Sequence, residues 1–348
     1  MKTKIMMAAV LGAMFLTACE PVEPEKTEEM GTLSINVQQL MQTKAASTEA
    51  TAAESQVNKM RVLVYDSSEN LYKDIALESP YTTVNINNVK KGQYIVCALA
   101  NTCAAVSNVN TKSSLYGTAV SLSDCGLTAS KGFVMFGGKN DVNVQASTTP
   151  TATSITVTRY PARVKLVSVK NELPASLGDL TVESVMLING FSSWVLSASG
   201  SAGTMMNPAG RKNNGTGDII ASASDANFSD YSFKAVPEAD RIVANGAAAK
   251  SYGYCFYSFP NTNSSEVVGP KQTGGKARLV VKASFNNKSY YYPVTLVDGM
   301  QRNKCYEVSL VIGGTGSEDP NVPVEKGIIG ASISVKDWVS GGDYSETI

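Results

Sequence analysis

The stretch "TLSINVQQLMQTKAAST", residues 32–48, begins with a β-strand pattern and continues into a polar segment. Leu33, Ile35 and Val37 alternate with polar residues, and this period of two predicts a strand with one apolar face. The pattern then ends, and Lys44 is the only basic residue between positions 40 and 58. Because a trypsin-like protease cuts after basic residues, such a protease could cut this segment after Lys44.

Similar short runs, alternating or wholly apolar, recur along the chain, whereas helix patterns are scarce. Clusters of Gly, Asn, Ser and Pro separate the runs, and this spacing predicts an all-β protein made of antiparallel β-sandwiches. Asn286 and Asn287 stand between two runs and predict a hairpin turn, because Asn tolerates positive φ. The expected strands cover residues 32–37, 59–66, 81–89, 92–100, 131–138, 153–159, 162–170, 180–190, 252–260, 277–287, 288–297, 304–314 and 330–338.

A boundary between two domains is predicted near residue 158. The polar run "STTPTATS", residues 147–154, has the composition of a linker, and Pro161 then marks the start of a fresh alternating strand. The chain is therefore divided into an N-terminal sandwich, residues 31–158, and a C-terminal sandwich, residues 159–348. Within the second, residues 198–250 are predicted to form extended loops with one short strand around "YSFKAV" at 231–236.

The composition argues against several classes of function. Lys plus Arg equals Asp plus Glu at 30 each, so no net charge favours nucleic acid as a partner. Histidine is absent, which removes the commonest general base and the commonest metal ligand. No pair of carboxylates is placed on one strand face as an acid–base couple. We therefore predict no metal, no cofactor and no enzymatic activity.

The first 30 residues have the features of an exported lipoprotein. Residues 1–18 combine early positive charge with a short apolar run, which fits a signal peptide and is too short to span a bilayer. "LTAC" at 16–19 resembles a bacterial lipobox, so Cys19 is the expected site of lipidation. Two or three acyl chains on Cys19 would anchor the chain stably. Residues 19–30 are acidic and lack core residues, which predicts a disordered tether.

Further segments along the chain carry a resemblance to a known family. They are "VNKMRVLVYDSSEN" at 57–70, "VMFGG" at 134–138, "ITVTRYPARVKLVSV" at 155–169, "QRNKCYEVSLVIGG" at 301–314 and "ISVKDW" at 333–338. Together with the lipobox and the first strand, this order resembles the fimbrillin family of Bacteroidales, whose members are lipoprotein-derived subunits of type V pili. The resemblance implies two tandem transthyretin-like antiparallel β-sandwich domains after the signal peptide.

The resemblance also implies how such a chain works. A trypsin-like, usually Arg-specific, protease removes the first strand, and the groove that this leaves accepts a strand from the next subunit. Here Leu33, Ile35 and Val37 would be the displaced strand. Ala331, Ile333 and Val335 alternate with polar residues near the C-terminus and are the candidate donor strand. The segment 40–58 departs from the family pattern because it contains no arginine, so Lys44–Ala45 is the expected site instead.

The expected partners are other pilus subunits, the processing protease, the outer membrane through the lipid, and a host or bacterial surface ligand. The precursor would lie at the outer membrane and the mature subunit in a surface fimbrium that supports adhesion. Three alternatives stay open from the residues: a tip or anchor subunit of the pilus, a surface glycan-binding lipoprotein, and a secreted enzyme that uses carboxylates. Trp338, near the end of the last strand, is expected to fill a core or an interface.

Overall fold

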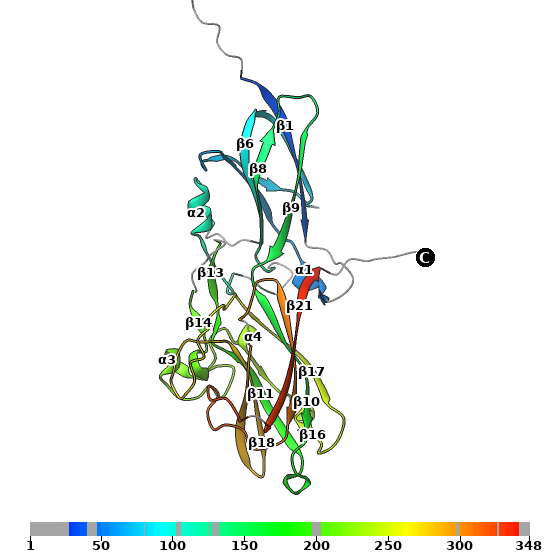
Figure 1. The fold of residues 1–348 in the computed structure, drawn as a ribbon, viewed down its shortest axis with the longest axis vertical. Coiled ribbons are helices and arrows are strands. Elements are labelled where there is room, and N and C mark those ends of the chain that lie inside the picture. The colour runs from blue at the N-terminus through cyan, green and yellow to red at the C-terminus, as the bar shows by residue number, and fades with distance from the viewer. Residues whose placement is uncertain are drawn as a thin grey trace, which may run out of the picture.

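The computed structural model describes residues 28–39, 47–79, 81–101, 106–124, 126, 132–196, 203–296, 299–325 and 327–340. These residues are mostly β-strands with a few short helices, so the prediction of an all-β protein is confirmed. Most strands of residues 30–159 gather at one end of an elongated molecule, and most strands from residue 162 onward lie at the other end (Figure 1).

The first sheet is made by the N-terminal strands. Their order across the sheet is β4 (Leu71–Leu77), β3 (Met60–Asp66), β6 (Gly92–Ala100), β8 (Met135–Val144), β9 (Thr151–Arg159), β1 (Met30–Gln39) and β5 (Thr83–Lys90). β1 therefore lies between β9 and β5. The inward side chains of β1 contact those of β3, β5, β6, β8 and β9 in one hydrophobic core.

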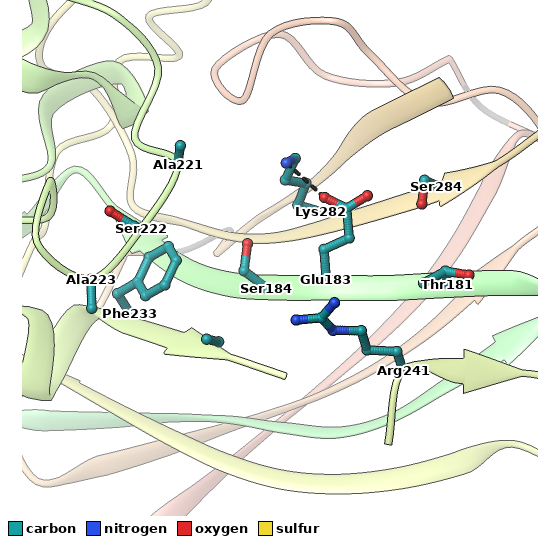
Figure 2. A pocket seen from close by; sticks show the side chains of 11 residues that line it. Thr181, Glu183, Ser184, Ala221, Ser222, Ala223, Phe233, Arg241, Lys282 and Ser284 are labelled. Carbon is teal, nitrogen blue, oxygen red and sulfur yellow. Dashed lines mark ion pairs between the residues drawn. The ribbon is translucent and has the colours of Figure 1, made fainter. Parts of the chain in front are cut away.

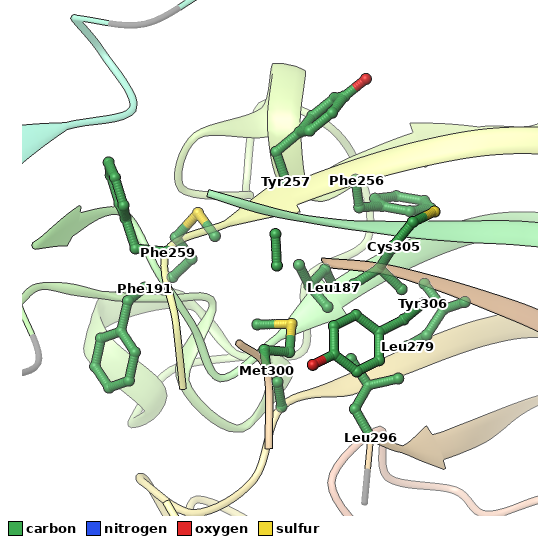
Figure 3. Close-up of a cluster of buried hydrophobic side chains, with 14 of the residues drawn as sticks. Leu187, Phe191, Phe256, Tyr257, Phe259, Leu279, Leu296, Met300, Cys305 and Tyr306 are labelled. Carbon is green, nitrogen blue, oxygen red and sulfur yellow. The ribbon is translucent and has the colours of Figure 1, made fainter. Parts of the chain in front are cut away.

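Two further sheets pack face to face at the other end. One has the order β17 (Lys250–Ser258), β10 (Ala162–Asn171), β20 (Lys304–Ile312), β21 (Ile329–Ser340) and β2 (Ser47–Ala50). The other has the order β15 (Phe233–Ala235), β11 (Leu180–Ile188), β18 (Arg278–Phe285) and β19 (Lys288–Thr295), with β16 (Ile242–Val243) also paired to β11. Figure 3 shows Leu187 and Leu279 of one sheet and Phe256 and Tyr306 of the other converging on the buried space between them.

The remaining elements are short. The helices are α1 (Ala52–Ser55), α2 (Lys112–Tyr116), α3 (Lys212–Gly215) and α4 (Ser229–Ser232), with single 3-10 turns at Ala175–Leu177, Pro208–Gly210 and Glu238–Asp240. The strands β12 (Gly190–Phe191) and β14 (Met205–Met206) pair with each other, as do β7 (Ala119–Ser121) and β13 (Ser193–Val195). No described helix is both long and apolar enough to cross a membrane.

Several local predictions are confirmed. Asn286 and Asn287 have φ values of 48° and 57° and join β18 to β19 as a tight hairpin. Pro161 lies between the end of β9 and the start of β10, where it interrupts no ladder. The expected short strand in "YSFKAV" is β15, although β14 and β16 also lie within residues 198–250. Trp338 is completely buried, as a core residue should be.

Other features differ from the expectations. Most ladders are antiparallel, but β1–β9, β10–β20 and β2–β21 are parallel. Residues 198–250 contribute more packing than their composition indicated, because Met206, Ile220, Phe233 and Val243 are buried against the sheets. β2 belongs to the range 31–158 yet pairs with β21, so residues 47–50 join a sheet made otherwise of C-terminal strands. The exact division into two domains stays a prediction.

Candidate functional site

The first strand fills a slot in the N-terminal sheet. Leu33 and Ile35 are fully buried and Val37 is 3% exposed, all three within the core of the first sheet. Ile35 lies opposite Val84 on β5 and Thr153 on β9. Burying a side chain of this size contributes roughly 1.5–3 kcal/mol, so the three together contribute roughly 5–9 kcal/mol.

β1 also completes the hydrogen bonding of both its neighbours. It pairs with β9 from Leu33 to Gln39 and with β5 from Met30 to Asn36. Within the described residues, β5 has no other strand beside it. Removing β1 would therefore leave an apolar gap with unpaired backbone groups along both sides. Such an edge is a template for pairing with another strand.

The predicted modification and cleavage sites are Cys19 and the bond between Lys44 and Ala45. Cys19, Lys44 and Ala45 lie outside the described residues. On either side of the predicted cleavage segment, β1 ends at Gln39 in the first sheet and β2 begins at Ser47 beside β21. The two strands that flank the segment therefore belong to different sheets.

The predicted donor residues lie on β21, which pairs antiparallel with β20 of the same chain. Ala331 is exposed, Ile333 is half-buried against the core, and Val335 is 53% exposed. β2 pairs with residues 337–340 of β21 on its other side. In the part of the chain that the structure describes, residues 329–336 have no second neighbouring strand, so this edge of β21 is open.

The far end of β21 is held by the Trp338 cluster, which we define as Trp338, Phe133, Tyr257, Arg159 and Arg163. The Trp338 ring stacks on Tyr257 with centroids 5.8 Å apart and meets the edge of Phe133 at 5.4 Å. The guanidinium carbons of Arg159 and Arg163 lie 4.8 and 5.2 Å from the centre of its ring. Cation–π contacts of this kind are strongest where water is excluded, as it is here.

Glu54 of α1 provides the negative charge beside this cluster. Its carboxylate accepts hydrogen bonds from Arg163 Nη1 at 2.7 and 3.0 Å and from the Tyr257 hydroxyl at 2.8 Å. Glu54 is 1% exposed and Arg163 is 3% exposed, so the ion pair is buried. The Thr51 N–H donates to the same carboxylate and the Thr51 hydroxyl accepts from the Glu54 N–H, which closes a capping box.

Arg159 joins three segments that are distant in the sequence. Its Nε donates to the Glu54 carbonyl at 2.9 Å, its Nη2 to the Ser55 hydroxyl at 3.1 Å, and its Nη1 to the Trp338 carbonyl at 2.8 Å. Arg159 is also the last residue of β9, the strand that flanks β1. The slot that β1 fills and the buried end of β21 are thus connected through β9 and its last residue, Arg159.

Burial sets the electrostatics of this cluster. It lowers the pKa of Arg159 to about 10, although the nearby Glu54 carboxylate works in the opposite direction. The pKa of the Tyr257 hydroxyl is raised by burial and by its proximity to Glu54, which keeps the hydroxyl a hydrogen-bond donor. Both groups therefore hold their protons at neutral pH. The buried ion pair of Glu54 and Arg163 favours one arrangement of the two residues, because removing either one leaves the other as an unpaired charge.

A second contact between the two ends of the molecule is made by Arg302, between β19 and β20. Its Nη2 donates to the carbonyls of Phe136 and Thr158, each at 3.0 Å, and to the Thr158 hydroxyl at 2.6 Å. The same guanidinium lies 4.0 Å from the centre of the Tyr160 ring. These contacts fix the junction between β9 and β10.

Sequence reasoning identified β1 and β21 but missed what holds β21 in place. The pattern T-x-x-E at 51–54 is a capping-box signature, and it was the only available signal for α1 and Glu54. Arg159 and Arg163 lie within strands, where a charge is normally read as solvent-facing. Among the described residues, no cluster of three or more acidic, Cys or His side chains could hold a metal ion, and Cys97, Cys255 and Cys305 form no disulfide.

Comparison with known proteins finds a family likeness over the N-terminal part of the chain. Residues 31–177 match the family described as major fimbrial subunit protein (FimA). This part of the chain is therefore similar to the major fimbrial subunit family. The resemblance predicted from the sequence is thereby confirmed. No curated protein sequence matches the chain significantly.

Solved structures show that the fimbrillin fold extends over nearly the whole chain. A candidate cell adhesion protein from Bacteroides eggerthii superposes with a TM-score of 0.66 at 17% identity, over 90% of this chain and 97% of that one. A fimbrilin (FimA) from Porphyromonas gingivalis superposes with a TM-score of 0.62 at 13% identity, over 91% and 99%. The tip fimbrial protein Mfa3 of the same organism gives 0.52 at 13% identity, over 88% and 100%. The chain thus has the fold of fimbrial and cell adhesion proteins.

Proposed function

We propose that this chain is a structural subunit of a type V pilus that polymerises by strand exchange and supports adhesion. The single observation that carries the proposal is the position of β1. Leu33, Ile35 and Val37 are buried in the core, yet they come from the first strand that the structure describes and are followed by a segment with one basic residue, Lys44. A strand in this place can be removed by one cut, and its loss leaves a slot that a second subunit can fill.

The strand that fills the slot is, in this proposal, the C-terminal β21 of a neighbouring subunit. Ala331, Ile333 and Val335 have the same spacing of two as the residues that they would replace. Two of them are exposed in the monomer, so transfer to an apolar slot would bury surface that the subunit leaves in water. A contact between a slot at one end and a strand at the other is heterologous and propagates as a filament.

Release of β21 requires that the Trp338 cluster opens. The indole Nε1 of Trp338 is buried without a hydrogen-bond partner among the described residues. Burying a donor without a hydrogen-bond partner costs about 1–3 kcal/mol, so the buried position of Trp338 in the monomer carries an energetic penalty. β2 pairs with the same end of β21, and it immediately follows the segment that contains Lys44. Cleavage there would free the chain end next to β2 and loosen the hold on β21.

The remaining parts of the proposal concern export. Cys19 would be lipidated, residues 19–30 would tether the precursor to the outer membrane, and the trypsin-like protease would release the mature subunit into a surface fimbrium. The two sandwiches, residues 31–158 and 159–348, would be tandem transthyretin-like domains. Replacing Cys19 by alanine should abolish incorporation of labelled palmitate and leave the precursor outside the membrane fraction. Palmitate incorporation that persists in this variant would contradict the assignment.

Trypsin treatment of the purified chain from residue 20 onward tests the polymerisation mechanism. We expect SDS-resistant ladders whose subunits begin at Ala45, and none from Lys44→Ala. A product that starts at Ala45 and stays strictly monomeric would contradict strand exchange. If ladders do not form with this protein alone but form when a second subunit supplies the donor strand, the chain is a tip subunit, which needs only the slot. A chain that keeps Cys19 in purified fimbriae would be the anchor.

Val335→Asp tests the donor role of β21 while leaving the stability of the monomer nearly unchanged. Val335 is 53% exposed, so aspartate should change the stability of the monomer by less than about 0.5 kcal/mol. In the slot the same carboxylate would be buried without a partner, and ladder formation should be lost. Ile242→Asp is the matched control, because Ile242 is 51% exposed and lies outside β21. Normal ladders from Val335→Asp would refute the assignment of β21 as donor.

A further inference from the structure

A cavity on the outer face of the β11–β18 sheet is distinct from the slot and from the Trp338 cluster. It has a volume of about 470 Å³, within the range that small ligands occupy. Its walls come from β11, β15, β18 and residues 221–223, so part of it is built by the long 198–250 stretch. Figure 2 shows Glu183, Ser184, Lys282 and Arg241 arranged around it.

A β-bulge in β11 aims two polar side chains into this cavity. The register of β11 against β18 shifts between Val182 and Ser184, so Glu183 is an extra residue. Val182 and Val185 both face the buried core, and the two residues between them are therefore both turned outward. The sequence carries the signal of this bulge, because the alternation of "LTVESVMLI" breaks at Glu183 and Ser184. Bulges of this kind often re-aim side chains at binding sites.

The charges in the cavity leave one cation without a partner. Glu183 is neutralised by Lys282, whose Nζ lies 2.6 Å from its carboxylate, and it also accepts a hydrogen bond from the Ser289 hydroxyl at 2.8 Å. Burial opposes the charge, yet the hydrogen bonds from Lys282, Ser284 and Ser289 lower the pKa of Glu183. Arg241 donates from Nε to the Val236 carbonyl at 3.0 Å. Its Nη atoms have no ion pair or hydrogen bond within the described ranges.

Hydroxyl groups and a small apolar surface complete the lining. Ser184 is only 7% exposed, its hydroxyl has no hydrogen-bond partner among the described residues, and it points between Ser222 and Lys282 (Figure 2). The hydroxyls of Thr181 and Ser222 lie on the same walls. Phe233 and three alanines provide the apolar contact. Residues 221–223 are held in place because Asp225 accepts hydrogen bonds from the Ala221 N–H and the Ser222 hydroxyl.

We propose that this cavity binds a sugar residue that carries a carboxylate. The free Nη atoms of Arg241 form a planar fork that matches a carboxylate in a bidentate arrangement. The hydroxyls of Ser184, Ser222 and Thr181 match the ring hydroxyls of a sugar, and Phe233 matches its C–H face. A single inorganic anion would leave most of the volume empty, and a neutral sugar would leave the Arg241 fork unpaired. The adhesion ligand of the subunit would then be an acidic glycan.

Titration of the chain from residue 20 onward with the methyl glycoside of N-acetylneuraminic acid, followed by NMR, tests this assignment. We expect saturable millimolar binding, and at least tenfold weaker binding of the methyl ester of the same glycoside, which has no charge. Arg241→Lys keeps the charge but loses the fork, and it should weaken binding about tenfold with an unchanged unfolding temperature. Ser184→Ala should weaken it several-fold. Lys170→Gln, on a different sheet, should have no effect.

Three outcomes would overturn the proposal. They are equal binding of the acid and its ester, competition by inorganic sulfate at the same concentration as the sugar, and unchanged affinity in both Arg241→Lys and Ser184→Ala. The assignment does not depend on pilus assembly, because binding is measured on the monomer. A chain that binds the sugar acid but forms no ladders, either alone or with a second subunit, would refute strand exchange alone.

Discussion

Replacing Glu54 by alanine should release the C-terminal end of β21. The substitution removes the carboxylate that pairs with Arg163 and leaves this buried guanidinium without a counter-charge. Breaking one side of a buried ion pair costs about 3–5 kcal/mol. The Tyr257 hydroxyl loses its acceptor at the same time. Glu54→Gln should cost less, because the amide retains an oxygen that can accept from Arg163 or Tyr257.

The assay uses the fluorescence of Trp338 itself. The chain has two tryptophans, so Trp194→Phe leaves Trp338 as the only reporter. In this background we expect Glu54→Ala to lower the urea midpoint of the Trp338 transition by roughly 1–2 M, given a slope of about 3 kcal/mol per M. Its emission should also move to longer wavelength, because Trp338 is fully buried in the native chain.

Glu172→Gln is the control for a general effect of removing a carboxylate. Glu172 pairs with Lys170 at the surface, where both side chains are largely exposed, so its loss should change stability by less than about 1 kcal/mol. If Glu54→Ala leaves both the midpoint and the emission of Trp338 within the range of this control, the buried ion pair does not hold β21. The account of how β21 is retained in the monomer would then be wrong.

Three further predictions concern the N-terminal sheet and its junction. Ile35→Ala should lower the free energy of unfolding by about 2–5 kcal/mol, measured by urea denaturation before cleavage, and an effect below 1 kcal/mol would contradict the burial of β1. Gly137→Ala should destabilise the chain by about 1–3 kcal/mol in thermal unfolding, because the new Cβ would lie 2.1 Å from the Thr156 carbonyl oxygen. Gly138→Ala is the control and should be tolerated, because the atom nearest to its Cβ, the Tyr116 hydroxyl, is 3.5 Å away. Burial raises the pKa of Tyr160 from 10.0 to about 12, so its stabilising effect is complete below pH 10 and is lost as the pH rises to 12. This loss amounts to roughly 3 kcal/mol, and Tyr160→Phe should flatten the alkaline stability curve accordingly.

The alternation of side chains predicted most strands because one face of each lies against a core. β1 is the clearest case, since Leu33, Ile35 and Val37 alternate with polar residues and all three are buried. β4 was missed because only its last residue, Leu77, is buried, and an edge strand with this burial carries no apolar period. Its register and its pairing with β3 depend on a neighbour that the local sequence does not specify.

Only part of the candidate site could likewise be predicted from the sequence. The strand that fills the slot could be predicted because the residues of β1 follow one another along the chain. The Trp338 cluster could not, because Glu54, Arg159 and Trp338 are brought together only by the packing of three separate segments. The bulge at Glu183 could be read from a broken alternation, but the free guanidinium of Arg241 beside it comes from a segment nearly 60 residues later.

The place of β1 between two neighbours has a mechanical consequence. Any strand that occupies this position is bonded along both sides, to β5 and to β9. Tension applied along the strand axis loads the two ladders in shear, so many backbone hydrogen bonds must rupture together. Tension applied across the axis would open them one by one. A joint of this geometry resists drag from flowing liquid best when the pull follows the axis of this strand.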